Sequence, residues 1–431
     1  MYRLLLILIV FYCQCGFSIG QIKNYTKAKE QPDLLPNITS QIPSEVRLVG
    51  LGDVQFFLKE SAILNNSIAK KLITERHFNT YIMSIPDWRI RELNTYLNNE
   101  KAFASTKQEY DSLFLDAFSG TIYNNPETKE MLEWIKTYND KNWTVKVKII
   151  GSGFVGFAPQ KLPAMNKYII NTYLKPMMSA NEIQNALDKN SDVMTIESDS
   201  AIVWFLSTLE DKIDEFVSSG QGDMDAVLLG QMQYDYSQRR AASSIYLKRL
   251  PANVERFRLL SASYDLETKL IDSLLKDERN KIIYPAIDNF TFSNIELIVS
   301  DNDGNNLKIQ SGDYYREKYK NTFFSSVIAF SDSVKIFRIK DGNLWQSVVE
   351  KGDSLTRALK IKKSVYTLPK DAKALRHFAI PVYPKGIWGM NAKYQFTTGD
   401  NPFDMLIILD SLQRNSPVDG KRSMDLDFIT F

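Results

Sequence analysis

Cysteine is nearly absent from this chain of 431 residues. The two cysteines, Cys13 and Cys15, both lie in an apolar N-terminal segment that has the form of a cleaved signal peptide. Once that segment is removed, no cysteine remains. This excludes disulfides, a thiolate nucleophile and a zinc site with cysteine ligands.

Histidine is as scarce, because the sequence contains only His77 and His377. Any Ser-His or His-metal mechanism would have to use one of them. His77 lies just before a predicted strand, at its amino end, whereas active sites of parallel α/β sheets gather at the carboxyl ends of strands. We interpret both histidines as surface or structural residues, and we predict no metal site and no cofactor.

The chain also lacks a large excess of charge of one sign. Lys and Arg number 53 against 51 Asp and Glu, which gives a net charge of +2. Such a balance gives no support for a nucleic-acid-binding surface. We therefore expect no nucleic-acid partner and take a small-molecule ligand as the expected partner, while the oligomeric state stays open.

The N-terminus has the three parts of a signal peptide: Arg3, an apolar run over residues 4–12, and small and polar residues up to Gly20. The run is shorter than the roughly 20 apolar residues that cross a bilayer. We therefore expect cleavage near Gly20, export to the periplasm or the medium, and no transmembrane domain in the mature chain. An uncleaved anchor is the alternative. Residues 21–44, rich in Pro, Asn and Gln, read as a linker.

Apolar runs that alternate with helical apolar stripes predict an α/β fold over residues 45–431, with a mostly parallel central sheet flanked by helices. Asn125 and Pro126 are typical of a helix start. Residues 164–250 read as a large helical insertion. The remaining predictions are a helix at 264–276 and strands near 46–51, 80–85, 145–149, 257–260, 293–299, 323–329, 334–338 and 405–409.

Several segments, taken in order, resemble the erythromycin esterase family. One is the strand and turn at 48–53, followed by the Phe-Phe-Leu of 56–58; another is the Trp-x-x-x-Tyr-Asn helix end at 134–139. Further matches are residues 76–84, 374–378 and 401–408. The resemblance implies an α/β fold and cleavage of ester bonds, notably of macrolide lactones. The reaction it implies uses a water activated by histidine, without a metal.

The sequence departs from that family where the chemistry should be. The turn after Asp53 is about five residues shorter than the family's turn and lacks its histidine, so that Asp53 and Gln55 stand in for the family's two glutamates. Glu60 stands where the family has a basic residue, and Ser84 stands where the family has a glutamate. The segment of the family that contains two histidines aligns best with residues 260–265 of this chain, and these residues include no histidine.

The leading hypothesis is therefore a non-catalytic binding or interaction protein of this fold, a pseudoenzyme. Its candidate cleft residues are Gln55, Ser84, Asp87, Ser261 and Ser263. Asp87, which follows Pro86, is also well placed to begin a helix. None of the three serines can be argued as an activated nucleophile without a base within reach.

The alternative hypothesis is an ester hydrolase with a rebuilt site in which carboxylates replace histidine. Asp53, Glu60 and Asp265 are the candidate catalytic residues, with one carboxyl group raised in pKa to act as the base. Carboxylates that converge in one pocket would favour the enzyme, and dispersed ones the binding protein.

Residues 301–305, Asp-Asn-Asp-Gly-Asn, resemble part of a calcium loop. They lack the glutamate that would complete the site. We interpret them as a polar turn between two strands.

Overall fold

The computed structural model describes somewhat less than half of the chain. The described residues are 34–53, 59–85, 87–98, 107–119, 121, 123–152, 179, 181, 267–285, 295–300, 306–309, 311–340, 344–351, 364–367, 391–396, 403–412, 416, 418 and 419. The predicted signal peptide, the helical insertion apart from two isolated residues, and His377 lie outside them.

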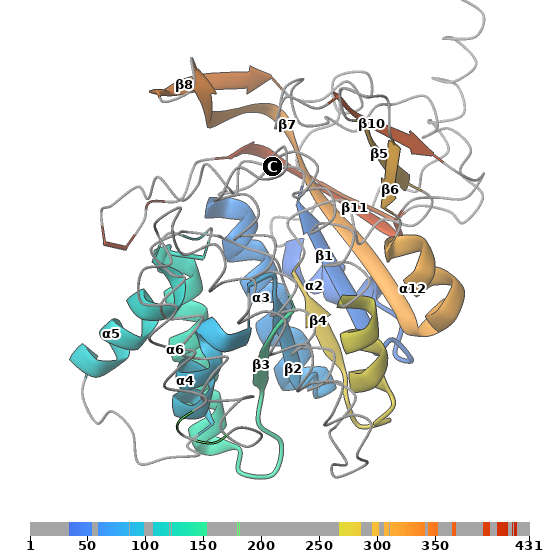
Figure 1. Cartoon of the computed structure of the whole chain (residues 1–431). Coiled ribbons are helices and arrows are strands. Elements are labelled where there is room, and N and C mark those ends of the chain that lie inside the picture. Colours follow the sequence, from blue (N-terminus) through green and yellow to red (C-terminus); the bar gives the residue numbers. More distant parts are fainter. Residues whose placement is uncertain are drawn as a thin grey trace, which may run out of the picture.

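An eight-stranded sheet forms the centre of the molecule (Figure 1). Its strands from one edge to the other are β3 (Lys148–Gly151), β2 (Thr80–Met83), β4 (Ile282–Tyr284), β1 (Leu48–Asp53), β7 (Phe323–Lys340), β11 (Met405–Leu412) and β9 (Ser364–Thr367), and β8 (Leu344–Lys351) pairs with β7. The six strands from β3 to β11 are parallel, and β8 and β9 are antiparallel to their neighbours. The predicted α/β class is confirmed.

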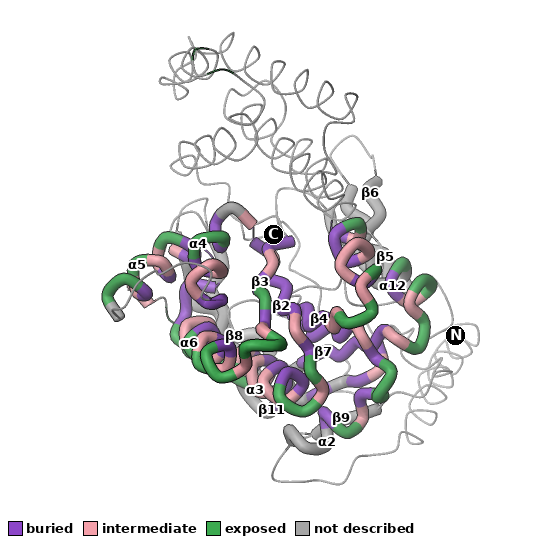
Figure 2. The backbone as a smooth tube through the Cα atoms, turned by 90° about the horizontal axis from the view of Figure 1, so that it is seen from below, coloured by how far each residue is buried: buried purple, intermediate pink, exposed green. Residues whose placement is uncertain are grey.

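Helices cover both faces of this sheet (Figure 2). The α3 face packs against α2 (Leu34–Gln41), α3 (Lys59–Arg76), α4 (Asp87–Leu97), α5 (Lys107–Phe118) and α6 (Pro126–Lys141). The α12 face packs against the helix over residues 267–275 and α12 (Ser311–Tyr319), which the short 3-10 helix η5 (Lys320–Thr322) follows. Strands β10 (Asn391–Phe396), β5 (Ile295–Ser300) and β6 (Asn306–Ile309) form a separate antiparallel sheet.

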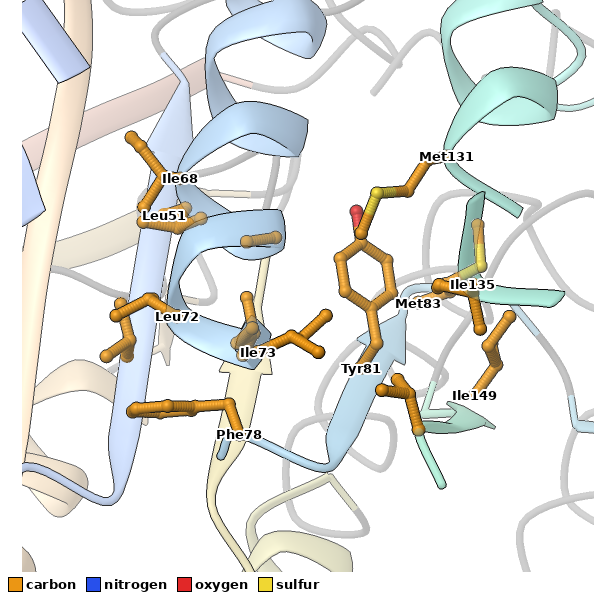
Figure 3. Close-up of a cluster of buried hydrophobic side chains, with 14 of the residues drawn as sticks. Leu51, Ile68, Leu72, Ile73, Phe78, Tyr81, Met83, Met131, Ile135 and Ile149 are labelled. Atoms are coloured by element: carbon orange, nitrogen blue, oxygen red, sulfur yellow. The ribbon is translucent and has the colours of Figure 1, made fainter. Parts of the chain in front are cut away.

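Side chains alternate between the two faces along each strand, as strand geometry requires. Tyr81 and Met83 of β2 point to the α3 face, where they meet Ile73 and Met131 (Figure 3). Ile82, between them, joins the cluster on the α12 face. Each aliphatic side chain removed from water in this way contributes about 1.5–3 kcal/mol, so both helix layers are held mainly by apolar burial.

The N-terminal part of the domain differs from its prediction as a linker. Residues 34–41 form α2, and Ile38 and Ile42 are buried in the core of the α3 face. Arg76 at the end of α3 donates hydrogen bonds to the carbonyl oxygens of Ile42, at 2.8 Å, and Pro43. The predicted linker therefore ends before residue 34, because apolar residues at helical spacing outweigh the Pro and Asn content.

Strand β4 was missed by the sequence analysis, although it lies between β1 and β2. Leu48 of β1 pairs with Ile282, and Thr80 of β2 pairs with the same residue. The run has only three residues, which is too short to show a periodicity. The two strands predicted at 323–329 and 334–338 are one strand, β7.

Two motif residues have structural roles. Asn125 caps α6 as predicted, since its side chain accepts a 2.8 Å hydrogen bond from the amide of Thr128. Asn139, the last residue of the Trp-x-x-x-Tyr-Asn motif, is fully buried. Its amide donates to the carbonyl oxygens of Leu97 (3.1 Å) and Val147 (3.0 Å) and accepts from the Val147 amide (2.8 Å). It joins the ends of α4 and α6 to the chain entering β3.

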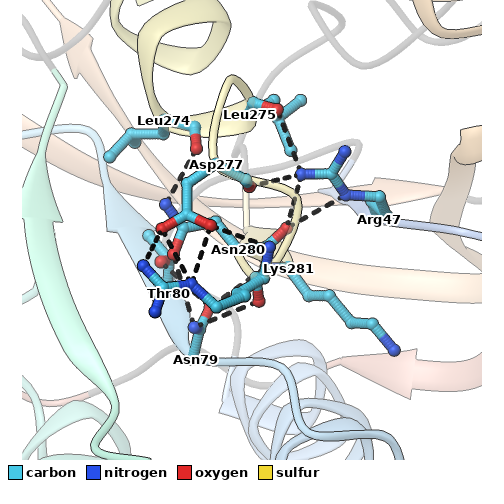
Figure 4. Close-up of polar contacts among 9 residues, drawn as sticks. Arg47, Asn79, Thr80, Leu274, Leu275, Asp277, Asn280 and Lys281 are labelled. Atoms are coloured by element: carbon cyan, nitrogen blue, oxygen red, sulfur yellow. Dashed lines mark hydrogen bonds and ion pairs between the residues drawn. The ribbon is translucent and has the colours of Figure 1, made fainter.

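A polar network holds β4 at the amino edge of the sheet (Figure 4). Arg47 donates to the carbonyl oxygens of Leu275 (3.0 Å), Asp277 (2.6 Å) and Asn280 (3.2 Å), which close the helix that precedes β4. Asn79 accepts a 3.0 Å bond from the amide of Lys281. Charged donors on backbone oxygens are among the stronger hydrogen bonds, so this edge fixes the position of β4 between its neighbours.

Candidate functional site

The connections that leave β1 and β4, two neighbouring strands, run to opposite faces of the sheet. β1 leads into α3 on one face, and the chain after β4 reaches α12 on the other before it enters β7. In open α/β sheets, ligands bind outside the carboxyl ends of the strands at such a switch point. The carboxyl edge around β2, β4 and β1 is therefore the candidate site.

Four polar side chains meet on the α12 face at this edge. Ser84 follows β2, and its Oγ lies 3.4 Å from the hydroxyl of Tyr284, the last residue of β4. Tyr284 donates a hydrogen bond to one carboxyl oxygen of Glu267, and Tyr315 of α12 donates to the other at 3.2 Å. We call these four residues the hydroxyl–carboxyl chain. It runs from the sheet edge into the interior.

Burial differs along this chain. Glu267, Tyr284 and Tyr315 are at most 3% exposed, whereas Ser84 is half-buried. Burial raises the pKa of Glu267 to about 7, although the hydrogen bonds from both tyrosines act to lower it. The pKa of Tyr315 is raised well above its usual value, first by burial and then by the nearby Glu267. Glu267 therefore changes charge near neutral pH while Tyr315 stays protonated.

Asp87 lies at the neighbouring corner, where β2, α4 and β3 meet. As predicted, it begins α4, and its Oδ1 accepts a 3.2 Å hydrogen bond from the amide of Gly151. Burial raises the pKa of its carboxyl group above the usual range. A Cβ at position 151 would lie 2.4 Å from the carbonyl oxygen of Ile85 and 2.6 Å from the Asp87 amide, so this approach requires glycine.

The other predicted site residues are not gathered around one point. Asp53 is the last residue of β1, paired with Ile328 of β7, and Glu60 lies in the first turn of α3. The strands that carry Asp53 and lead into Asp87 are separated by β4, which puts them about 10 Å apart at two strand spacings. Gln55, Ser261, Ser263 and Asp265 lie outside the described residues.

His77 lies at the opposite edge of the sheet from the candidate site. It is exposed and follows the last residue of α3, with a positive φ of 58° that ends the helix. No group of three metal-ligating side chains occurs within the described ranges.

Sequence reasoning missed Glu267, Tyr284 and Tyr315 as site residues. Ser84 was identified, but it was judged to lack an activating partner. The available signal was weak: Tyr284 ends a short apolar run before Pro285, and Glu267 precedes the apolar stripe of a helix. Ser84 and Tyr284 are 200 residues apart, so only the fold brings them together.

Comparison with known proteins identifies the fold. No protein-family model and no curated protein match the sequence. The structure is similar to a protein from Bacillus cereus, with a TM-score of 0.61 and 14% identity over 93% of this chain and 98% of that one. It is similar to a succinoglycan biosynthesis protein, with a TM-score of 0.56 and 13% identity over the same shares of the two chains.

A third similar structure is a mutant of the erythromycin esterase EreC in its open conformation. Its TM-score is 0.59, with 15% identity over 89% of this chain and 95% of that chain. The resemblance noted in the sequence is thus confirmed at the level of the fold. The chain has the fold of an erythromycin esterase.

Proposed function

We propose that this chain is an exported, non-catalytic protein of the erythromycin esterase fold that binds a small molecule at the carboxyl edge of its sheet. One observation carries the proposal. At that edge Ser84, Tyr284 and Glu267 are hydrogen-bonded in a chain and Asp87 accepts from the Gly151 amide, whereas His77 lies at the other edge.

The absence of histidine among the described residues at this edge matters because activation of water needs a base near its working pKa. The sequence offers only His77 and His377, and the two residues between Asp53 and Phe56, Val54 and Gln55, are not bases. The candidate carboxylates Asp53 and Asp87 belong to segments separated by a strand. Dispersed carboxylates favour a binding protein over a hydrolase.

Export is supported by the form of the first 20 residues, which also contain both cysteines. Among the helices of the described part, none is long and apolar enough to cross a membrane. Protein sequencing of the N-terminus after expression of the full chain tests this element. A mature chain that begins at Gln21 supports export, and an intact Met1 in a membrane fraction contradicts it.

A second candidate is an ester hydrolase that works with a carboxyl base. It is favoured by Glu267, whose pKa of about 7 leaves it partly ionised at neutral pH, and whose carboxylate connects through Tyr284 to Ser84. A nucleophile, a base and a linking group within hydrogen-bonding reach are the signature of an activated serine.

Turnover of erythromycin and of simple esters distinguishes the two functions. The protein purified after expression of the full chain is assayed beside the variants Ser84→Ala and Asp53→Asn. Ser67→Ala, on the exposed side of α3, is the matched control. We expect no turnover by any of them, and binding of erythromycin by calorimetry. Hydrolysis that disappears with Ser84→Ala or Asp53→Asn but survives in Ser67→Ala would overturn the proposal and establish the hydrolase.

A further inference from the structure

The loop between α6 and β3 is fixed at both of its ends. Asn142 caps α6, because its backbone amide (3.0 Å) and its side-chain amide (2.8 Å) both donate to the carbonyl oxygen of Tyr138. Val147 is buried, and its amide and carbonyl oxygen are both bonded to the side chain of Asn139. The residues between these anchors lie at the amino end of β3, below the sheet in Figure 1.

The tip of this loop, residues 143–145, is apolar and exposed. Trp143 is 76% exposed and Val145 is 41% exposed, and they are two of the four large apolar side chains that are exposed in the described part of the chain. The Nζ of Lys146 lies 5.8 Å from the centroid of the Trp143 ring and donates to the carbonyl oxygen of Asn98. The indole is thus held against a fixed neighbour, and its remaining surface would gain free energy from a partner that removes it from water.

Positive charge surrounds the loop tip. Lys141 and Lys148 lie on its two sides, and both are exposed. Residues 141–148 contain no acidic residue, and the preceding Asp140 forms an ion pair within α6. None of the ion pairs among the described residues includes Lys141 or Lys148. Both charges are therefore available to an anionic partner.

An exposed tryptophan between lysines fits a lipid surface better than a protein or a nucleic acid. At a membrane interface the amphipathic indole lies among the headgroups, and lysine reaches the phosphates while its methylene stem stays in contact with apolar groups. Protein interfaces are depleted in lysine and need about 20–30 residues on each side. Single-stranded nucleic acids are bound along basic grooves with successive aromatic side chains, whereas this loop contains one.

We propose that this loop docks the protein on a membrane surface that contains anionic phospholipids. Trp143 and Val145 enter the headgroup region, Lys141 and Lys148 meet the phosphates, and Lys146 positions the indole. Because the loop lies at the amino edge of the sheet, the docked protein holds the candidate site at the carboxyl edge toward the aqueous phase. The inference does not depend on the proposed ligand binding.

Co-sedimentation with vesicles tests the proposal on the protein purified after expression of the full chain. Vesicles of phosphatidylcholine alone are compared with vesicles of equal parts phosphatidylcholine and phosphatidylglycerol. We expect at least about 10-fold stronger partitioning onto the anionic vesicles, and this preference should vanish in about 1 M salt. Lys141→Gln and Lys148→Gln should each weaken partitioning about 5-fold, and Trp143→Ala about 10-fold.

Lys59→Gln and Ile63→Ala are the matched controls for charge and for apolar surface. Both side chains are exposed on α3, roughly 20–25 Å along the helix from Arg76 at the amino edge, and both variants should bind vesicles as wild type does. Thermal melts show that each variant is folded.

Equal partitioning of wild type onto the two kinds of vesicle would overturn the inference. So would anionic-vesicle binding that survives Trp143→Ala or the two lysine substitutions combined, or that is lost equally in the controls. Calorimetry with erythromycin on samples without vesicles tests the proposed function separately, so that either proposal can fail while the other stands.

Discussion

The two edges of the parallel sheet use polar side chains differently. At the amino edge, Arg47 and Asn79 bind backbone groups of the segment that enters β4, so their hydrogen bonds fix the position of a strand. At the carboxyl edge, Ser84, Tyr284 and Glu267 bind one another, and a carboxyl group is held near neutral pKa. The hydrogen bonds at the amino edge stabilise the fold. Those at the carboxyl edge hold a titratable carboxyl group beside the switch point of the sheet.

The largest effect that we expect is the pH dependence that Glu267 adds to stability. Its pKa is about 7 in the folded protein against an ordinary value of 4.5, so the folded state binds the proton more tightly than the unfolded state. The stabilisation is complete below pH 4.5 and is lost as the pH rises through 7. Across this window the free energy of unfolding should fall by about 3 kcal/mol because of Glu267.

Urea denaturation at pH 5 and pH 8 measures this effect. Between the two pH values the free energy of unfolding should decrease less in Glu267→Gln than in wild type, and the difference should be up to about 3 kcal/mol. All other titrating groups are common to both proteins, so they cancel in the comparison. An unchanged decrease would show that Glu267 is not held in its protonated form by the fold.

At the amino edge, Arg47→Ala should lower the free energy of unfolding strongly, and the size of this loss should depend little on pH. The substitution leaves the carbonyl oxygens of Leu275, Asp277 and Asn280 without their charged donor, and we expect a loss of about 2–3 kcal/mol in the free energy of unfolding. Denaturation curves measure it, with Arg47→Lys as the matched control that keeps the charge. A loss that appears only above pH 7 would contradict the distinction between the two edges.

At the carboxyl edge, Gly151→Ala should cost about 2 kcal/mol, because the new Cβ would meet backbone atoms that must move. The shift would displace Asp87 and the neighbouring Ser152. We therefore expect weaker binding of erythromycin as well as a lower melting temperature. A stability loss with unchanged binding would place the ligand away from the ends of β2 and β3.

The smallest effect concerns His77. A histidine with φ of 58° is strained relative to glycine, so His77→Gly should raise the free energy of unfolding by about 0.5 kcal/mol and leave ligand binding unchanged. Chemical denaturation and calorimetry check both parts. Impaired ligand binding in this variant would give His77 the functional role that its position at the amino edge argues against.

Local patterns predicted most of the sheet and part of the site. β1 and β2 were found because their apolar runs are flanked by turn signals, and the start of α6 was found because Asn125 and Pro126 have specific capping roles. β4 was missed because its three residues are too few to show a hydrophobic periodicity. Ser84 contacts Tyr284 of β4, and Tyr284 contacts Glu267 of the helix over residues 267–275, so no local pattern could have indicated this chain of contacts.

The insertion of β4 between β1 and β2 has a consequence for the order in which the chain can fold. Leu48 of β1 pairs with Ile282 and Phe323, and Thr80 of β2 also pairs with Ile282, so β1 lacks both of its partner strands and β2 lacks one of them while the chain is short. Until the later segment arrives, both strands present unpaired edges, which slows folding and invites association with other chains. A fragment that stops at residue 152 should therefore aggregate rather than fold, and its rescue by a separately added 267–351 segment would report on the assembly of the central strand.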